Sequence, residues 1–396
     1  MKICVISNLF PPIMRGGAER VAERVARGLA DAGHEVFVIS TKPWSGRESL
    51  KPTATDEQGI KVYRFYPANI YYYLDGHKHN TLWRAKWHFL DMFNFHSRRV
   101  VKNILKEEKP DIVMTHNLMG IGFLLPRMIR GLGIKYVHTL HDVQLVVPSG
   151  LILKGQEKNW EQRTWLRKVY EKFCRWLFNS PDVVVSPSKW LLDFYANKGF
   201  FKKSKKIVLP NPVERIYPAG IPMDNSILKL LYLGLIEEHK GIFLLVEVLK
   251  KCDFDFRLHI AGDGSKMEEL KKMIGDDLRF VIHGKLVGEK LIKIFDLVDL
   301  MVVPSLCYEN SPAVIYESLA AGVPVIAAKI GGVAELVKDK ENGFTFEVGN
   351  NEDLLRVLKH AAANRDELQK MRPATVKSVE GFKIENYINC LLESIK

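Results

Sequence analysis

The stretch that decides the fold is Pro304–Glu335, with the sequence PSLCYENSPAVIYESLAAGVPVIAAKIGGVAE. It follows a short apolar run at 298–303, which is typical of a buried parallel strand. Ser311 predicts a helix N-cap, Pro312 suits the first helical position, and good helix formers continue until Gly322. The strand therefore leads into a helix N-terminus, where unpaired backbone N–H groups and the helix dipole favour an anion such as a phosphate.

Two carboxylates flank this predicted anion site. Glu309 lies in the loop before the helix, and Glu317 lies at about its second turn. Glu317 falls on the flank opposite the apolar residues of the helix, where it could accept hydrogen bonds from a ribose diol. A loop carboxylate and a solvated helix residue that bind no ligand would have the same spacing. Spacing alone therefore leaves open whether the two glutamates bind a ligand or are ordinary surface residues.

The whole stretch resembles the signature of the retaining family-4 glycosyltransferases, enzymes of the GT-B fold. In that signature a Glu, seven residues and a second Glu precede an Ala-Gly-Val-Pro-Val strand and a Gly-Gly turn. The corresponding residues here are Glu309, Glu317, Gly322–Val325 and Gly331 with Gly332. The loop Asn310-Ser311-Pro312 differs, because many members have a glycine and an aromatic residue there.

The N-terminal stretch has a strand, a glycine turn and a helix. Lys2–Ser7 predicts the strand, and Gly16-Gly17-Ala18-Glu19-Arg20 opens an amphipathic helix. It lacks the G-x-G-x-x-G pattern, which disfavours a dehydrogenase. The sequence GGAER resembles the first glycine loop of the family, and this implies that Gly16 and Gly17 lie at the donor and Glu19 on the acceptor side.

Histidines follow two predicted strands of the first half. The strand 111–115 ends at His116, and the strand 135–140 ends at His141 and Asp142. Ligands of open α/β sheets collect beyond the carboxyl ends of the strands, so these side chains are expected at a ligand-binding edge. His116 is in the place of the family's active-site histidine. His141 and Asp142 resemble the His-Asp pair of many members, which implies a place on the acceptor side.

Alternating strands and helices continue through the rest of the chain. The first half predicts further strands at 35–41, 60–66, 182–187 and 206–209, helices from 82 to 104 and over 160–178, and a mobile loop at 42–59. After a proline-rich connector at 210–213, strands at 230–235, 256–261, 279–283, 300–303 and 323–328 alternate with helices near 242–251, 267–274, 289–295 and 312–321. The fold class is therefore α/β, with two doubly wound parallel sheets.

The resemblance implies how these parts are used in the GT-B fold. Two Rossmann-like domains face each other across an interdomain cleft. Residues 1–209 form an N-terminal acceptor-binding domain and residues 210–380 a C-terminal nucleotide-sugar donor-binding domain. A helix at 381–396 crosses back to the N-terminal domain.

Lys240 follows the first strand of the second half, where a lysine can neutralise a diphosphate. The family usually has Gly-Arg before it and Glu-Lys-Gly at this point. Leu235 replaces the arginine here, and His239 replaces the glutamate. This departure from the family pattern bears on the strength of diphosphate binding.

The charge is concentrated in one half. Residues 1–205 contain 33 Lys+Arg and 18 Asp+Glu, and residues 206–396 contain 25 and 28, so their net charges are +15 and −3. This imbalance favours an anionic surface or ligand for the first half, although a solvated basic surface would look the same. Residues 71–106 mix aromatic and basic side chains, as at an acidic membrane surface, but a helix packing its aromatic face on the domain would too. No recognition signature of a nucleic-acid-binding protein is present.

Composition places the chain in a reducing compartment. Its five cysteines are scattered, and no stretch reaches the roughly 20 apolar residues of a transmembrane helix. The first residues predict a strand and are too short for a signal peptide. We expect a cytoplasmic protein, with the inner face of the cytoplasmic membrane as an alternative location.

The resemblance implies a metal-independent, retaining hexosyl transfer from a nucleotide diphosphate sugar, most often UDP- or GDP-linked, to a hydroxyl acceptor, with no other cofactor. Cell-surface polysaccharide, lipopolysaccharide and glycolipid synthesis are the expected settings, and the acceptor is expected to be lipid-linked or anionic. His116, Glu309 and Lys240 are the implied catalytic residues. The implied donor-binding residues are Gly16, Gly17, Lys240, Glu309, Asn310, Ser311, Pro312 and Glu317. Two alternatives stay open: a non-catalytic GT-B scaffold or partner subunit, and a nucleotide-sugar epimerase.

Overall fold

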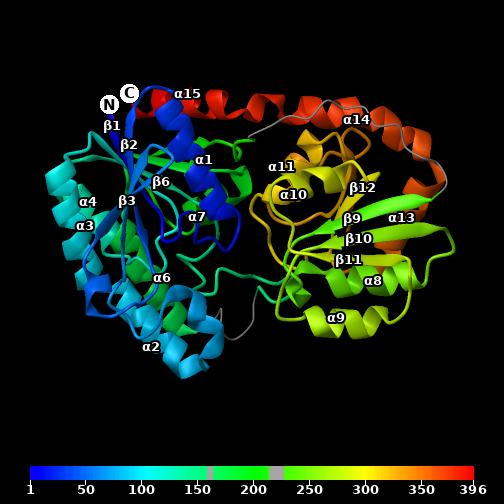
Figure 1. The fold of residues 1–396 in the computed structure, drawn as a ribbon, viewed down its shortest axis with the longest axis horizontal. Coiled ribbons are helices and arrows are strands. Elements are labelled where there is room, and N and C mark those ends of the chain that lie inside the picture. The colour runs from blue at the N-terminus through cyan, green and yellow to red at the C-terminus, as the bar shows by residue number, and fades with distance from the viewer. Residues whose placement is uncertain (158–163, 214–226) are drawn as a thin grey trace. The chain divides into compact units, whose positions relative to one another are not determined.

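The computed structural model describes residues 1–157, 164–213 and 227–396 (Figure 1). The chain divides into two compact units that do not follow a single cut in the sequence. The first unit is Met1–Gly150, Asn159–Pro212 and Ile384–Lys396, and the second is Leu151–Lys158 and Val213–Lys383.

The first unit is built on an eight-stranded sheet with the order β3-β4-β2-β1-β5-β6-β7-β8. Neighbouring strands are parallel except β3, which is antiparallel to β4. The strands are β1 Lys2–Ile6, β2 Glu35–Thr41, β3 Thr53–Glu57, β4 Ile60–Phe65, β5 Ile112–Thr115, β6 Lys135–Thr139, β7 Val183–Ser186 and β8 Lys205–Val208.

The expectation of a mobile loop at 42–59 is wrong. The 3-10 helix η1, Arg47–Leu50, and strand β3 lie there, and β3 is exposed along most of its length. The Arg64 guanidinium of β4 joins this strand to β3 by donating to Thr55 Oγ1 at 2.9 Å and to Glu57 Oε1 at 3.0 Å. An edge strand with polar residues on both faces has no apolar alternation, so the sequence pattern did not predict β3.

Helices cover both faces of this sheet, so the first unit is doubly wound. They are α1 Gly17–Asp31, α2 Thr81–Met92, α3 Phe95–Glu108, α4 Leu125–Gly131, α6 Trp165–Phe178, α7 Lys189–Asn197 and α15 Ile384–Ile395, with the 3-10 helix η2 Tyr73–Lys78. Figure 1 shows α3 and α4 on one side of the sheet and α1 on the other. Helix α15 packs beside α1, and a Cβ on Gly28 would lie 2.6 Å from Ile384 Cγ1, so glycine permits this close approach.

One helix prediction of the first unit needs correction, and another extends beyond the described residues. The helix expected from 82 to 104 is two helices, because Asn94 begins a new one by accepting the Ser97 N–H at 2.8 Å. Asn94 also donates to the Ala68 carbonyl at 3.1 Å, which anchors the break. Of the helix expected over 160–178, residues 165–178 are helical, and 158–163 lie outside the described residues.

The second unit contains a six-stranded, wholly parallel sheet with the order β11-β10-β9-β12-β13-β14. The strands are β9 Leu228–Leu233, β10 Phe256–Ala261, β11 Phe280–Gly284, β12 Leu300–Val303, β13 Val325–Ala328 and β14 Gly343–Phe346. The sequence did not predict β14. This strand starts at Gly343, where a Cβ would lie 2.0 Å from the Val325 carbonyl oxygen.

Two apolar clusters, one on each face, hold helices against the second sheet. Helices α8 Ile242–Lys250, α9 Met267–Ile274 and α13 Asn351–Ala363 share one cluster, and α10 Glu289–Phe295, α11 Ala313–Ala320 and α12 Val333–Leu336 share the other. Figure 1 shows α8 and α9 on the opposite side of the strands from α10 and α11. The 3-10 helices η3 Glu238–Lys240 and η4 Glu380–Phe382 and helix α14 Arg365–Val379 complete the unit.

Candidate functional site

Lys240 and Glu309, distant in sequence, meet at the carboxyl edge of the second sheet. Lys240 ends η3, which follows β9, and Glu309 lies in the loop after β12. Strands β9 and β12 are neighbours in a parallel sheet, so their C-terminal loops emerge side by side. Lys240 Nζ lies 2.6 Å from Glu309 Oε1.

The pair is largely buried, and the attraction between the two charges outweighs the cost of burial. The exposed fractions of the side chains are 26% for Lys240 and 14% for Glu309. Burial lowers the pKa of the Lys240 ammonium, but the Glu309 charge more than offsets this, and the pKa is raised. Burial likewise raises the pKa of the Glu309 carboxyl, while Lys240 and a 2.9 Å hydrogen bond from Ser305 Oγ bring it below its usual value. Both groups are therefore charged at neutral pH.

Close backbone contacts hold this pair in place. Gly331 has a positive φ of 62°, and a Cβ there would lie 2.0 Å from the Glu309 carbonyl oxygen. That oxygen accepts the Gly332 N–H at 2.9 Å. Gly241 also has a positive φ, and its Cβ would lie 1.9 Å from the Pro304 carbonyl oxygen. The glycines next to Lys240 and opposite Glu309 are thus required by the packing of the site itself.

The helix after Glu309 begins one residue later than expected. Pro312 occupies the N-cap position with φ −62° and ψ 119°, and α11 starts at Ala313. The prediction that Ser311 caps the helix is wrong, because its hydroxyl lies 2.6 Å from the Tyr316 hydroxyl instead. Proline has no side-chain acceptor, so the N-cap residue of α11 makes no side-chain cap. Glu317 lies half-buried on the second turn of this helix, and Asn310 is buried beside its start.

A segment that sequence analysis missed lies against the Glu309 loop. Leu153 forms an antiparallel bridge with Cys307, the Lys154 N–H donates to the Leu306 carbonyl at 3.0 Å, and the Tyr308 N–H donates to the Ile152 carbonyl at 2.8 Å. The Tyr308 hydroxyl also donates to Glu157 Oε1 at 2.8 Å. These backbone bonds join residues about 150 positions apart and have no signal in a single sequence.

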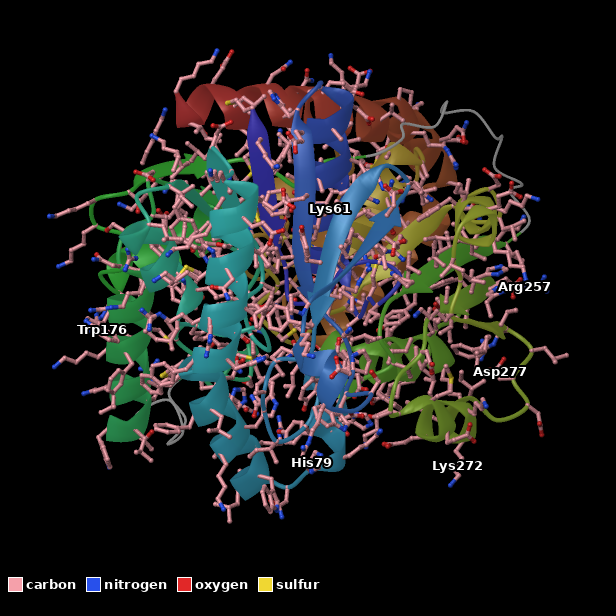
Figure 2. All side chains as sticks on the ribbon, turned by 60° about the vertical axis from the view of Figure 1, so that its left-hand side comes forward. Lys61, His79, Trp176, Arg257, Lys272 and Asp277 are labelled. Atoms are coloured by element: carbon pink, nitrogen blue, oxygen red, sulfur yellow. The ribbon has the colours of Figure 1, made fainter. Side chains whose placement is uncertain are left out.

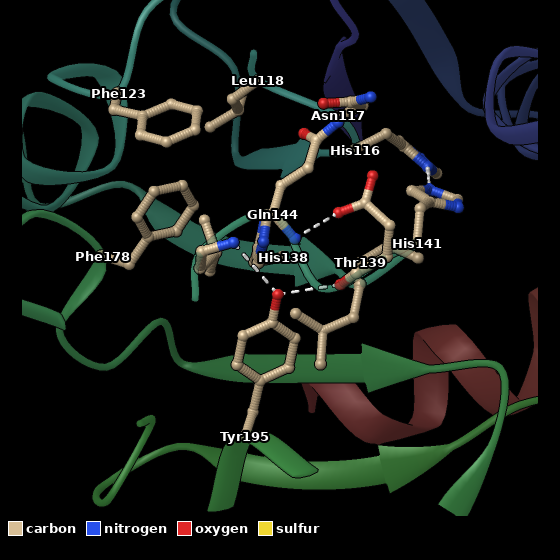
Figure 3. Close-up of a pocket in the computed structure, with 13 residues that line it drawn as sticks. His116, Asn117, Leu118, Phe123, His138, Thr139, His141, Gln144, Phe178 and Tyr195 are labelled. Atoms are coloured by element: carbon tan, nitrogen blue, oxygen red, sulfur yellow. Dashed lines mark hydrogen bonds between the residues drawn. The ribbon is translucent and has the colours of Figure 1, made fainter. Parts of the chain in front are cut away.

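The histidines of the first unit also meet as their strand positions predict. His116 follows β5 and His141 follows β6, and His116 Nδ1 lies 2.9 Å from His141 Nε2 (Figure 3). His116 is 1% exposed, and its Nε2 has no hydrogen-bond partner among the described residues. Burial lowers the pKa of both rings, that of His141 to about 4, and the neighbouring His141 contributes to the lowering for His116. The pair is therefore neutral at pH 7.

Asp142 adjoins this pair at a cavity of about 20 Å³. Its Oδ1 accepts the Gln144 N–H at 2.8 Å, and its carbonyl oxygen accepts the Tyr195 hydroxyl at 2.8 Å. Burial raises the pKa of the Asp142 carboxyl to about 7, and the charge on Glu19 acts in the same direction. His116, His141 and Asp142 thus form one group, with Glu19 close enough to act on it.

The glycine loop before α1 caps the start of that helix. Gly16 is the N-cap residue, and its N–H donates to Glu19 Oε2 at 2.9 Å. Glu19 is 4% exposed and Gly17 is the first helical residue. A Cβ at Gly16 would meet only Glu19 Oε2, at 3.7 Å, so the packing of the chain does not require glycine there.

Leu235 lies on the turn between β9 and Lys240. Its side chain is 41% exposed, and its carbonyl oxygen accepts the Tyr232 hydroxyl at 2.7 Å. His239 lies half-buried next to Lys240, and its carbonyl oxygen accepts the Leu306 N–H at 2.9 Å. Burial and the Lys240 charge lower the pKa of His239. Within the described ranges, no three His, Cys, Asp or Glu side chains gather in a way that could hold a metal ion.

Comparison with known families decides the class of protein. Residues 15–215, half of the chain, match the family model described as Glycosyltransferase Family 4. The chain belongs to this family. Residues 219–378 of the glycosyltransferase match a second model, described as Glycosyl transferases group 1.

Relatives and solved structures agree with this assignment. An uncharacterized 42.6 kDa protein in the cps region of Klebsiella pneumoniae is 27% identical over 350 residues, which are 88% of the glycosyltransferase and 90% of that relative. Sucrose-phosphate synthase from Thermosynechococcus elongatus superposes with a TM-score of 0.77 at 19% identity, covering 99% of this chain and 97% of that one. HepE from Anabaena, solved in complex with UDP, gives 0.72 at 16% identity over 100% and 99%. The two parallel-sheet units of the glycosyltransferase therefore have the GT-B fold.

Proposed function

We propose that this glycosyltransferase moves a hexosyl unit from a nucleotide diphosphate sugar, UDP- or GDP-linked, to a hydroxyl acceptor with retention at the anomeric carbon. The observation that carries the proposal is the Lys240–Glu309 pair beside the start of α11. An ammonium group has three N–H donors, so Lys240 can bind Glu309 and a phosphate oxygen together. The solved complex of HepE with UDP supports a nucleotide donor for this fold.

In this proposal the second unit binds the donor. Lys240 and the N–H groups at the start of α11 stabilise the diphosphate, whose negative charge grows as it leaves. These groups supply the positive charge, so the proposed reaction has no metal. Glu317 accepts hydrogen bonds from the ribose, and Glu309 orients the donor sugar. Asn310, Ser311 and Pro312 line the donor, together with Gly16 and Gly17 of the first unit.

The first unit provides the acceptor side. His116 contacts the sugar, with Glu19, His141 and Asp142 toward the acceptor. The bond from the anomeric carbon to the diphosphate oxygen breaks, the acceptor oxygen forms the new bond on the same face, and the acceptor proton passes to the leaving oxygen. This route needs no carboxylate nucleophile, which a covalent glycosyl-enzyme would require.

The acceptor is lipid-linked or anionic, in the synthesis of a cell-surface polysaccharide, lipopolysaccharide or glycolipid. The support is the charge of residues 1–205, +15 against −3 for the rest of the chain. The proposed location is the cytoplasm, with peripheral contact to an acidic membrane surface through residues 71–106.

A thermal-shift screen of UDP, GDP and ADP with their common sugars tests the donor site. A nucleotide at about one hundred times its dissociation constant should stabilise the native protein by about 2.7 kcal/mol. Lys240→Met and Glu317→Ala should lose most of this stabilisation. Lys251→Met is the matched control, because Lys251 forms an ion pair of similar length, 2.7 Å, with Glu247, and these two side chains are 66% and 46% exposed.

The outcome also decides between enzyme and scaffold. Leu235, exposed where the family has an arginine, is the observation that favours a non-catalytic module. If no nucleotide stabilises the native protein, the donor site is absent and the scaffold interpretation replaces the proposal. If a nucleotide binds but its sugar changes without any acceptor, the nucleotide-sugar epimerase replaces it.

A further inference from the structure

Helix α6 has an exposed apolar stripe that does not pack against the first unit. At about 100° per residue, five large apolar side chains fall within an arc of about 100°. They are Trp165, Leu166, Val169, Phe173 and Trp176, with exposed fractions of 69%, 60%, 39%, 42% and 49%. The helix packs on the first unit through a different arc, which holds Cys174, Leu177 and Phe178. The exposed stripe is therefore a second apolar face.

Helix α2 exposes apolar side chains in the same way. Its first six residues, 81–86, are all exposed, so this part of the helix has no core beneath it. Leu82, Trp83, Phe89 and Leu90 are exposed by 66%, 44%, 64% and 43%. Tertiary packing normally supplies most of the stability of a short helix, and here half of α2 lacks it.

Aromatic contacts join the two exposed surfaces into one. The ring of Phe89 lies 5.2 Å from that of Phe93, and Phe93 lies 5.8 Å from Phe173 in an edge-to-face contact. Figure 2 shows α6, in green, beside α3 and α2, with Trp176 pointing away from the protein. We call this surface the aromatic face; it consists of Leu82, Trp83, Phe89 and Leu90 of α2 and Trp165, Leu166, Val169, Phe173 and Trp176 of α6. These are nine of the nineteen large apolar side chains exposed among the described residues.

Cations surround the aromatic face. Helices α2 and α6 contain six Lys or Arg residues and two carboxylates. One carboxylate, Asp91, is buried, and the other, Glu171, lies 3.3 Å from Arg175. Lys86 Nζ lies 4.9 Å from the centre of the Trp83 ring, and the Arg127 guanidinium lies 4.1 Å from that of Trp176. The face thus combines apolar rings with a positive rim.

We propose that the aromatic face docks the glycosyltransferase on an anionic phospholipid bilayer, with the rings of α2 and α6 among the headgroups and acyl chains. This docking proposal rests on the proposed function. It narrows the membrane contact proposed for residues 71–106 to α2 and adds α6 to it. Exposed Trp and Phe with Lys and Arg suit a membrane interface, whereas lysine is depleted in protein interfaces. No helix in the described part of the chain is long and apolar enough to cross a membrane, so the contact is peripheral.

The apolar contribution is tested by flotation of the full-length protein with vesicles of phosphatidylcholine, alone or mixed with phosphatidylglycerol. Trp165→Gln/Leu166→Gln should lower the partition coefficient on the acidic vesicles about tenfold, since both side chains leave the membrane. Leu278→Gln/Leu297→Gln is the matched control, because these leucines are 87% and 52% exposed in the second unit. The control pair should bind like the native protein.

The electrostatic contribution is tested by charge reversal. Lys168→Glu/Lys172→Glu on α6 should reduce binding to the acidic vesicles about tenfold or more. Lys272→Glu/Lys290→Glu makes the same change of charge in the second unit, at residues that are not part of the aromatic face. Native protein that partitions equally into neutral and acidic vesicles overturns the proposal. So does an equal loss in the control variants, or a native dimer that the Trp165/Leu166 variant converts to a monomer in light scattering.

Nucleotide binding separates this proposal from the proposed function. All four variants should keep the unfolding temperature of the native protein and its stabilisation by nucleotide, because their side chains are exposed. Loss of flotation alone, with the nucleotide response retained, confirms the aromatic face as the membrane contact. If no nucleotide binds, the proposed function fails, while the vesicle result still decides the docking surface.

Discussion

Breaking the Lys240–Glu309 pair gives a prediction whose size follows from the structure. Removing one partner of a fully buried ion pair costs about 3–5 kcal/mol, because a charge stays behind without compensation. Lys240 is about a quarter exposed and Glu309 about a seventh, so water compensates part of this loss. Ser305 also continues to donate to the carboxylate. We therefore expect Lys240→Met to lower the free energy of unfolding of the second unit by about 2 kcal/mol.

The partner substitution completes a double-mutant cycle. The amide oxygen of Glu309→Gln still accepts a hydrogen bond from Lys240, so this variant should lose only about 1 kcal/mol. The double variant removes both charges and should be more stable than the sum of the single losses by about 1–2 kcal/mol. The loss in Lys240→Met should also shrink at acid pH. The pKa of Glu309 is lowered in the folded state, so the stability that it contributes is present above its ordinary pKa and is lost as pH falls below it.

Urea unfolding provides the measurement because the tryptophans report on one unit only. Six tryptophans lie in the described residues and all six belong to the first unit, so their emission follows that unit, whereas far-UV circular dichroism follows both. The loss in Lys240→Met should appear in the dichroism and leave the emission transition in place. A Lys240→Met protein within about 0.5 kcal/mol of the native one, or a loss seen only in tryptophan emission, would refute the reasoning.

Three further substitutions have expected outcomes in the same urea assay. Asp91→Asn should have a free energy of unfolding up to about 4 kcal/mol above that of the native protein at pH 8, because burial raises the pKa of Asp91 to about 7. This difference in stability should disappear as pH falls toward 4. A difference that does not depend on pH would contradict the prediction. Gly331→Ala should cost more than about 2 kcal/mol, through positive φ and the contact with the Glu309 carbonyl, seen in dichroism; a neutral result would show that the loop shifts freely. The first unit should lose stability between pH 6.5 and 4, because His141 and His116 are neutral in the folded state and take up protons in the unfolded state. His141→Phe should make this loss smaller, as followed by tryptophan emission. An unchanged dependence of stability on pH would exclude the histidine pair as the source of the loss.

Strong periodic signals in the sequence predicted most of the fold. The strands Glu35–Thr41, Phe256–Ala261 and Leu300–Val303 have the expected bounds, because each is a short apolar run between turn residues. Helix α9, Met267–Ile274, also matches its expected range. The sequence missed β3 because it is a polar edge, and β14 because it is only four residues long and directly follows a polar turn.

Part of the candidate site was also predictable. Lys240 with Glu309, and His116 with His141, follow neighbouring parallel strands, so topology brings each pair together. Ser305 was missed because nothing in its sequence position indicates a hydrogen bond to Glu309. The roles of these residues toward a donor and acceptor stay predictions.

The bridge between Leu153 and Cys307 limits how this protein can be divided. The chain places residues 151–157 in the second unit, although the segments on either side of them belong to the first. A fragment or chimera cut at Val213 and Lys383 would omit this segment and leave the backbone groups of Leu306 and Tyr308 without their partners. Replacement of the second unit by that of a relative must therefore transplant the 151–157 segment as well. Each unit is compact in the structure, but neither unit is one continuous segment of the sequence.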